Sequence, residues 1–442
     1  MRRAAPGPSA VRDQPPVTGR LRRIAIDTTP LRHPSYRRLF VGQGVGFVGF
    51  QVTAVAVPVQ VYDISRSSFW VGILGVVGLV PLVVFGLWGG AVADAVDRRK
   101  LLLASSWLTW LVTLALLAQA VAELDSLPLL LALVAVQAGA FAVTSPTRNA
   151  ILPRLLDRSL VPAANTLNFT VTNVAMVAGP LLAGVVIARG GGFPAAYAID
   201  AMLFTVALYA AFRLPALPPL AEADQLARPG LRSVVEGLRF IAAQPVLLMS
   251  FVVDIIAMVF AMPRSLFPEV AETRFGGEQA VGWLFAAIAI GAVIGGLSSG
   301  WIGRVRRQGV ALTAAIVAWG GAVALSGLAR TLWLTVALLA VAGAADLVSA
   351  VFRQTILQVY APDEMRGRLQ GVFIVVVAGG PRLGDLRAGA TAAVAGATFS
   401  WVAGGVACVV VVILAALAVP AFLRYDARRP AISAPLTTSV PD

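Results

Sequence analysis

The sequence contains one cysteine, one histidine and one lysine. Because Cys408 is alone in an apolar run, the chain cannot form a disulfide framework or a thiolate metal site. The single His33, which precedes the first apolar run, excludes a multi-histidine metal centre. Charged residues make up 13% of the chain, where a soluble domain has about 25%. We therefore expect neither a metal nor any other bound cofactor.

Apolar residues, by contrast, make up 58% of the 442 residues, and the mean hydropathy is +0.83. Such a chain would expose large apolar patches in water, so a lipid bilayer is its expected environment. A helix that crosses the bilayer needs about 20 largely apolar residues. Runs of about this length lie at 38–62, 69–93, 100–122, 127–147, 163–188, 194–213, 246–268, 280–303, 309–328, 332–352, 369–395 and 397–422. The sequence therefore predicts an all-α membrane protein with twelve transmembrane helices.

A polar, proline-rich segment divides these runs into six and six. Its second part, 231–241, has the apolar spacing of a short amphipathic helix that lies at the membrane interface. The expected domains are a disordered basic cytoplasmic tail (1–35), a six-helix bundle (36–213), a cytoplasmic linker with the amphipathic helix (214–245), a second six-helix bundle (246–422) and a cytoplasmic tail (423–442).

The positive charges are distributed unequally between the two sides of the predicted membrane. Of the 35 lysines and arginines, five lie in the loops of one side, two lie inside the eleventh run and 28 lie on the other side. We count Arg148 and Arg353 among these 28 loop and tail charges. Loops rich in positive charge stay in the cytoplasm, so both termini are predicted to be cytoplasmic, in an inner-membrane protein. The net charge of +13 then reflects topology, and we expect no nucleic-acid partner.

Short motifs recur in the two halves. The segment Arg148-Asn-Ala-Ile-Leu is mirrored by Arg353-Gln-Thr-Ile-Leu, and Gly179-Pro180 is mirrored by Gly380-Pro381. Motifs that recur at a nearly constant offset indicate internal duplication, which is common in secondary transporters.

Four acidic residues lie inside the apolar runs: Asp200, Asp254, Asp346 and Asp385. A charge in hydrocarbon costs at least about 2.5 kcal/mol, so each is a candidate functional residue. Asp254 and Asp346 lie at similar depths, near the middle of the membrane. A carboxyl group kept away from water takes up a proton more readily, which suits proton coupling. Alternatively, each of these residues is neutral or hydrogen-bonded and serves packing.

The eleventh run contains three charges, Arg382, Asp385 and Arg387. Arg382 and Asp385 are three positions apart, on one face of a helix, and are expected to pair. A buried arginine stays charged, so it needs such a partner or an anionic ligand. The sequence leaves two interpretations open, a structural ion pair and a site for cargo or coupling.

Polar and aromatic residues in the first, fourth and seventh runs are candidates for a substrate cavity. The amides of Gln43, Gln51 and Gln137 would supply hydrogen bonds. An apolar wall for aromatic cargo would come from Phe47, Phe50, Phe141, Met258 and Phe260. Stripes of this kind also occur in ordinary helix packing.

The segment after the second run, Gly90-Ala-Val-Ala-Asp94-Ala-Val-Asp97-Arg98-Arg99-Lys100, resembles the signature between helices two and three of the major facilitator superfamily. The resemblance implies two pseudo-symmetric six-helix bundles whose first, fourth, seventh and tenth helices line a central cavity. It also implies that Gly90 allows close helix contact. Asp94, Arg98 and Arg99, with Asp97 between them, would form a cytoplasmic latch that holds the outward-facing state. Alternatively, these charges only set the topology.

The fifth run's Gly179-Pro180 is similar to the antiporter motif of exporters in this superfamily. A narrower resemblance is to the branch of siderophore (enterobactin) exporters and macrolide efflux proteins. It rests on segments such as His33-Pro34, Ser145-Pro-Thr-Arg148 and Pro362-Asp-Glu-Met-Arg-Gly-Arg368.

The resemblance implies a monomeric secondary transporter that exports a siderophore or a drug-like small molecule in exchange for protons. Multidrug or macrolide efflux without a siderophore role is the alternative, followed by nutrient uptake with protons. The chain has no Walker-type loop for ATP and no catalytic cluster, which argues against an ATP-driven pump and against an enzyme. No sequence feature favours a sensor or a scaffold.

Overall fold

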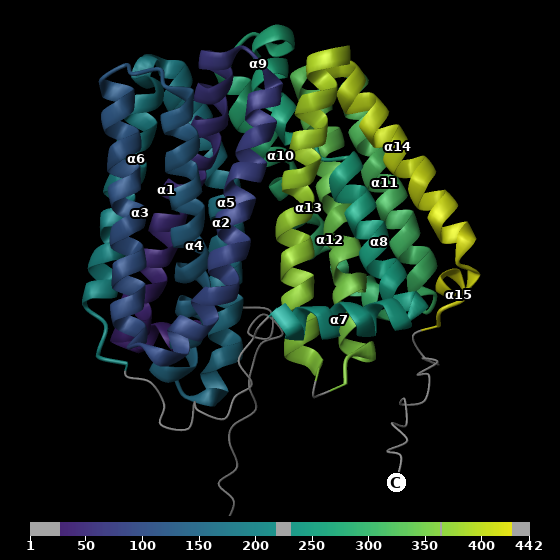
Figure 1. The fold of residues 1–442 in the computed structure, drawn as a ribbon, viewed down its shortest axis with the longest axis horizontal. Coiled ribbons are helices and arrows are strands. Elements are labelled where there is room, and N and C mark those ends of the chain that lie inside the picture. The colour runs from purple at the N-terminus through teal and green to yellow at the C-terminus, as the bar shows by residue number, and fades with distance from the viewer. Residues whose placement is uncertain (1–26, 218–230, 363–364, 427–442) are drawn as a thin grey trace, which may run out of the picture.

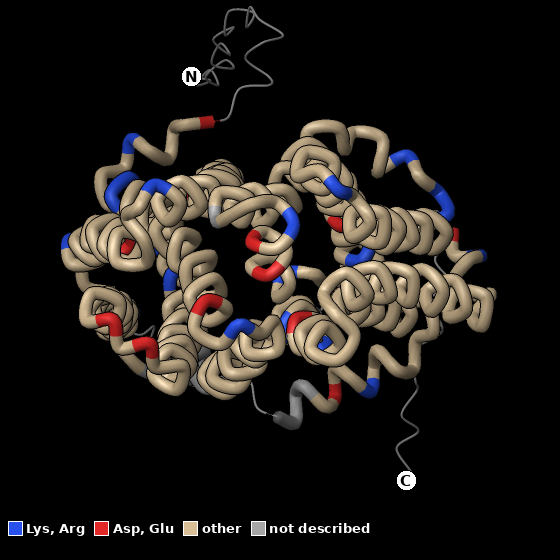
Figure 2. Tube along the Cα trace, turned by 90° about the horizontal axis from the view of Figure 1, so that it is seen from above, with Lys and Arg blue, Asp and Glu red and all other residues tan. Residues whose placement is uncertain are grey.

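The computed structural model describes residues 27–217, 231–362 and 365–426 (Figure 1). In these residues every regular element is a helix, as expected from the sequence. The long helices form two bundles, and Figure 2, which looks down on them, shows the bundles side by side.

The first bundle contains the long helices of the first half. They are α1 (Pro34–Ser65), α2 (Ser68–Ala95), α3 (Arg98–Val121), α4 (Leu127–Leu155), α5 (Val161–Val186) and α6 (Gly192–Phe212). The short turns η2 (Thr29–Arg32), η3 (Arg158–Leu160) and η4 (Ile187–Gly191) precede or join them. Between α5 and α6 the chain reverses at Gly190 and Gly192, whose φ angles of 83° and 58° favour glycine.

The second half begins with the amphipathic helix α7 (Leu231–Ala243), which packs against α8 and α13. The bundle itself contains α8 (Pro245–Phe260), η6 (Arg264–Leu266), α9 (Phe267–Phe275), α10 (Glu278–Leu297), η7 (Ser299–Arg304), α11 (Gln308–Leu328), α12 (Leu332–Tyr360), α13 (Arg366–Ala395), α14 (Ala397–Ala418) and α15 (Pro420–Leu423). In Figure 1, α7 and α9 mark opposite ends of this bundle, which we call the α7 end and the α9 end.

The sequence predicted one continuous helix for the seventh apolar run, but the structure shows a break within it. Helix α8 stops at Phe260, and the helical turn resumes at Arg264 after Pro263, which has no backbone N–H to donate. The carbonyl groups that this break leaves free need other partners. Arg387 supplies them, because its guanidinium donates to the carbonyl oxygens of Val259 (3.2 Å) and Phe260.

Two helices extend further than their apolar runs. The run at 127–147 predicts a helix that ends before Arg148, but α4 continues to Leu155. Likewise, the run at 332–352 ends before Arg353, but α12 continues to Tyr360. Treating Arg148 and Arg353 as loop charges was therefore wrong. Both are on the bundle helices that the fourth and tenth runs form.

Helices of the two halves touch along two seams, α2 against α13 and α5 against α10. Glycines make these seams close. A Cβ atom added at Gly72 would lie 2.6 Å from the Asp385 carbonyl oxygen, and one added at Gly282 would lie 2.6 Å from the Pro180 carbonyl oxygen. Small residues at such crossings let helix backbones approach each other in membranes.

In the described residues, ten segments are long and apolar enough to cross a membrane. One of them, residues 158–212, contains α5 and α6 in succession. The 30-residue α13 completes the set of twelve, since it packs against α2 and α8. The expected all-α fold of two six-helix bundles is confirmed.

The predicted disordered tail, residues 1–35, extends into residues that are helical in the structure. The described residues include the turn η2, in which Pro30 is buried, and α1 already begins at Pro34. Residues 1–26 of the predicted tail, residues 218–230 of the linker and residues 427–442 at the other terminus lie outside the described residues.

Candidate functional site

In the second half, a buried arginine lies between the two acidic residues that the sequence placed at mid-membrane. Arg353 of α12 forms an ion pair with Asp254 of α8 through Nη1, and its Nη2 lies 3.8 Å from Oδ1 of Asp346. Asp346 and Arg353 are seven positions apart, so they share one face of α12. We call these three residues the Arg353 cluster.

Burial within the Arg353 cluster is unequal. The side chains of Arg353 and Asp254 are 6% and 4% exposed, whereas the Asp346 side chain is 33% exposed. Arg353 also donates from Nε to the Ser349 carbonyl oxygen at 3.4 Å. The arginine is thus held firmly on Asp254, while Asp346 is further away and more accessible.

Charge balance determines what the Arg353 cluster can do. Within the cluster itself, two ionised carboxylates and one guanidinium leave one net negative charge, and Arg264 of η6 interacts electrostatically with Asp346 from outside the cluster. One proton on either carboxyl group makes the cluster neutral. The arrangement can therefore hold a single exchangeable proton. In the described part of the chain, no three His, Cys, Asp or Glu side chains gather as metal ligands would.

In the first half, a small cavity of about 30 Å³ lies among α1, α3, α4 and α6. It is lined by Gln43, Gly46, Phe47, Phe50, Thr109, Phe141, Thr144, Arg148, Phe204 and Ala207. We call it the Arg148 pocket. Of the predicted polar residues, Gln43 lines it, whereas Gln137 does not. Gln137 is buried, and its Nε2 has no hydrogen-bond partner among the described residues.

Three phenylalanines form a ladder along the Arg148 pocket. The rings of Phe47 and Phe50 are stacked with centroids 5.8 Å apart, and those of Phe50 and Phe141 are stacked at 5.5 Å. All three side chains are only half-buried. The sequence predicted these phenylalanines as an aromatic wall but missed Arg148, whose repeat in the second half was the available signal.

Asp200, the fourth acidic residue of the apolar runs, belongs to a separate polar network. It is 1% exposed and accepts hydrogen bonds from the hydroxyl groups of Thr53 (2.6 Å) and Thr113 (3.4 Å). One helical turn away on α6, Tyr197 donates to Gln60 at 2.7 Å. These contacts join α1, α3 and α6.

The charges of Arg382 and Asp385 interact electrostatically, but the two side chains form no ion pair within 4 Å among the described residues. Asp385 instead accepts a hydrogen bond from the backbone N–H of Ser265 at 3.2 Å, so it fixes the first turn after the break in α8. Arg382 lies along α2, where its Nε would be 3.9 Å from a Cβ atom added at Gly78. Its Nη1 is buried without a hydrogen-bond partner in the described chain. Arg387 donates to carbonyl oxygens of α8, and Asp385 accepts from the backbone after the break, so these two of the three charges stabilise the break.

The predicted latch between α2 and α3 is described only in part. Gly90 and Asp94 lie in a stretch whose side chains are outside the described residues. Asp97 caps α3 by accepting from the backbone N–H of Arg99 at 2.8 Å. Arg98 donates to the Ala150 carbonyl oxygen (3.2 Å). Arg99 donates to the Phe212 carbonyl oxygen (2.8 Å). These bonds join elements of the first half to one another.

Gly179 and Pro180 of α5 lie where α5 meets other helices closely. A Cβ atom added at Gly179 would be 2.4 Å from the Cβ atom of Gln51, so only glycine fits against α1. Pro180 faces the other half, because its carbonyl oxygen lies against Gly282 of α10. The motif therefore joins the contacts within the first half to the seam between the halves.

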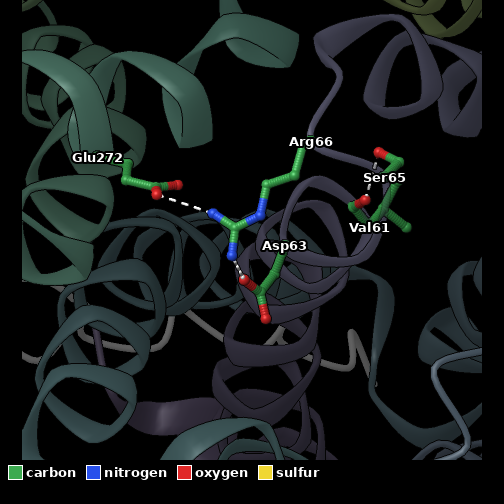
Figure 3. A network of polar contacts seen from close by, with 5 residues as sticks. All are labelled: Val61, Asp63, Ser65, Arg66 and Glu272. Atoms are coloured by element: carbon green, nitrogen blue, oxygen red, sulfur yellow. Dashed lines mark hydrogen bonds and ion pairs between the residues drawn. The ribbon is translucent and has the colours of Figure 1, made fainter.

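At the α9 end, polar contacts also join the halves (Figure 3). Arg66 pairs with Asp63 of α1 at 2.6 Å and with Glu272 of α9 at 2.8 Å. Nearby, the Ser68 hydroxyl donates to Glu269 of α9. Arg66 adopts a left-handed backbone conformation (φ 50°), which is uncommon for residues other than glycine. We call these contacts the Arg66 clasp.

Comparison with known proteins agrees with this architecture. The profile of a family described as transmembrane secretion effectors matches residues 26–437. The enterobactin exporter EntS of Shigella boydii serotype 18 is 28% identical over 404 residues, which cover 91% of this chain and 96% of the exporter. EntS of Escherichia coli O139:H28 matches with the same identity and coverage.

Solved transporter structures share the fold. A mutant of the nucleoside transporter NupG superposes with a TM-score of 0.71 at 13% identity and covers 88% of this chain and 100% of that one. A bacterial homologue of the lysosomal transporter Spinster, inward-facing and unoccupied, superposes with a TM-score of 0.68 at 17% identity. The two chains are covered to 90% and 97%.

Proposed function

We propose that this chain, which belongs to the transmembrane secretion effectors of the major facilitator superfamily, exports a siderophore or drug-like small molecule in exchange for protons. Family membership makes it a multi-pass secondary transporter and no enzyme. It would work in the inner membrane, with both termini and the α7 end in the cytoplasm, as the distribution of positive charge favours. Export is favoured by the family's description and by the relatives named as enterobactin exporters.

The observation that carries the proton coupling is the Arg353 cluster. Asp254 keeps Arg353 neutralised, and Asp346 is the more exposed partner that gains or loses the proton. When Asp346 is protonated, the cluster is neutral and Arg353 rests on Asp254 alone. When Asp346 is ionised, it competes for the same guanidinium. A proton thus changes how α8 and α12 attract each other, and α8 leads directly into the broken segment and α9.

Alternating access is supported by where the halves touch. The Arg66 clasp joins them at the α9 end. The molecule is therefore closed at its α9 end, which corresponds to an inward-facing state under the proposed orientation. In the outward-facing state, the clasp opens and the segment containing Gly90, Asp94, Asp97, Arg98 and Arg99 closes the α7 end.

Gly179 and Pro180 would serve this rocking motion, since α5 contacts α10 along one of the two seams between the halves. Arg382, whose Nη1 has no hydrogen-bond partner among the described residues, lies on the other seam, between α2 and α13, where relative motion of the halves would change its surroundings. We place Arg382 and Asp385 at the boundary of the coupling site. Gln43 and Gln137 would serve the substrate.

Transport by reconstituted protein tests this proposal. The full chain is incorporated into liposomes, and the inside-out fraction, whose C-terminal tag faces the bath in the proposed orientation, is measured by the accessibility of that tag to protease. Enterobactin, a macrolide and a nucleoside serve as separate cargo probes. We expect an acidic lumen to drive enterobactin or macrolide into the liposomes, and Asp346→Asn, which removes the carboxyl group that gains or loses the proton, to abolish this gradient dependence. Uptake driven instead by an acidic exterior would establish symport. Transport that is independent of any proton gradient in the wild type would overturn the coupling.

A further inference from the structure

Arg148 and Arg353 occupy matching places in the two halves but have different neighbours. They are 205 positions apart, within the repeated motifs on α4 and α12. Position 141 matches Asp346 at the same offset, and it is Phe141. Position 49 matches Asp254, and Gly49 packs against Asp200 there. Neither acidic residue of the Arg353 cluster has an acidic counterpart in the first half.

Arg148 is consequently a cation without a counter-ion among the described residues. The described residues offer it no ion pair or hydrogen bond, although Arg98 and Arg99, which are nearby in the fold, have partners. Asp200, which packs against Gly49, accepts hydrogen bonds from Thr53 and Thr113 and forms no ion pair with Arg148. Since a guanidinium keeps its proton in a protein, Arg148 cannot remove the imbalance by becoming neutral.

The size of the Arg148 pocket restricts what can balance this charge. About 30 Å³ is the space of two or so water molecules, which suits one carboxylate or phenolate group and excludes a whole drug-sized molecule. Thr109, Thr144 and Gln43 line the same space and can donate further hydrogen bonds to oxygen atoms. The phenylalanine ladder on α1 and α4 offers half-buried ring surface beside them.

We propose that the Arg148 pocket binds the anionic group of a transported substrate whose adjoining planar ring packs on Phe50 and Phe141. The anion neutralises Arg148 in the first half, as Asp254 and Asp346 neutralise Arg353 in the second. This inference deepens the proposed function, because it rests on the chain being a small-molecule transporter, and it assigns the substrate class of aromatic acids and phenolates. Bidentate hydrogen bonds from a guanidinium to a carboxylate make such recognition specific as well as strong.

Binding of matched probes tests the assignment without any gradient, so it is independent of proton coupling. The purified full chain in lipid nanodiscs is titrated by calorimetry with 2-naphthoate, with neutral 2-naphthamide, with cyclohexanecarboxylate and with inorganic phosphate. We expect 2-naphthoate to bind at least tenfold more tightly than each of the other three probes. Equal binding of naphthamide would overturn the role of charge, and equal binding of phosphate or cyclohexanecarboxylate would overturn the role of the ring.

Three variants locate the site. Arg148→Gln should weaken 2-naphthoate binding at least tenfold, and Arg148→Lys should restore part of it. Arg158→Gln removes an exposed positive charge just after α4 and should leave binding unchanged. Each variant's melting temperature shows whether it is folded. Wild-type affinity in folded Arg148→Gln would refute the assignment. If binding follows Arg148 while proton-driven transport fails, only the proposed coupling is lost.

Discussion

The two halves share one fold and one arginine, and they differ in how that arginine is neutralised. Arg353 lies against two acidic side chains of its own half, whereas Arg148 faces phenylalanines and a small cavity. An arginine with internal partners can respond to protons, because its partners titrate. An arginine without them can respond only to a ligand that carries charge. Under the proposed roles, duplication followed by loss or gain of acidic residues would separate coupling from recognition in the two bundles.

The largest effect should come from the same substitution made in both halves. Arg353→Gln leaves Asp254 buried without its ion-pair partner. Breaking a buried ion pair in this way lowers the free energy of unfolding by about 3–5 kcal/mol. Arg148→Gln breaks no ion pair and should not destabilise the protein. Thermal unfolding of both variants in detergent, followed by tryptophan fluorescence, measures the difference. Equal melting temperatures for the two variants would show that the Arg353 pairs contribute no stability.

Within the Arg353 cluster, the two acidic residues should differ in the same measurement. Asp254→Asn removes the charge that holds Arg353 directly, and both side chains are less than a tenth exposed. Asp346→Asn removes a partner that is 3.8 Å away and one third exposed, where water screens part of the interaction. We expect Asp254→Asn to lower the melting temperature clearly more than Asp346→Asn. A larger loss with Asp346→Asn would reverse the roles assigned to the two carboxyl groups.

Both acidic residues of the Arg353 cluster could be found in the sequence, since a charge inside an apolar run stands out. The two arginines could not be assigned to helices from the sequence, because a charged residue lowers the local hydropathy. The predicted runs therefore ended just before Arg148 and Arg353. The helices continue because protein, and not lipid, surrounds these side chains. The break after Phe260 has a signal in the sequence, Pro263 followed by the charged Arg264, but the predicted apolar run continued across both residues to position 268. Arg382 and Asp385 had the right spacing to pair, but Ser265, 120 positions away in sequence, is the partner of Asp385.

A smaller effect should follow when the first half receives an acidic residue of the second. Phe141→Asp places a carboxylate seven positions before Arg148, as Asp346 is placed before Arg353. We expect this carboxylate to occupy Arg148 and to lower 2-naphthoate affinity about tenfold, which is about 1.4 kcal/mol. Phe141→Asn is the control for the lost ring, and calorimetry measures both variants. If Phe141→Asn weakens binding as much as Phe141→Asp, loss of the ring alone accounts for the change.

The smallest effect belongs to the Arg66 clasp, which joins the halves where both partners are in contact with water. Arg66 and Glu272 are 58% and 53% exposed, and an exposed pair of this kind contributes at most about 1 kcal/mol. Arg66→Gln should therefore shift the balance between the closed and open α9 end by no more than about fivefold. Spin labels at the exposed positions Asp125, in the first half, and Thr273, on α9, would report the two distances in nanodiscs. Glu123→Gln, at the α3–α4 turn, removes an exposed charge outside the clasp and serves as the control. An unchanged distance distribution in Arg66→Gln, with the control also unchanged, would mean that the glycine seams alone hold this end closed.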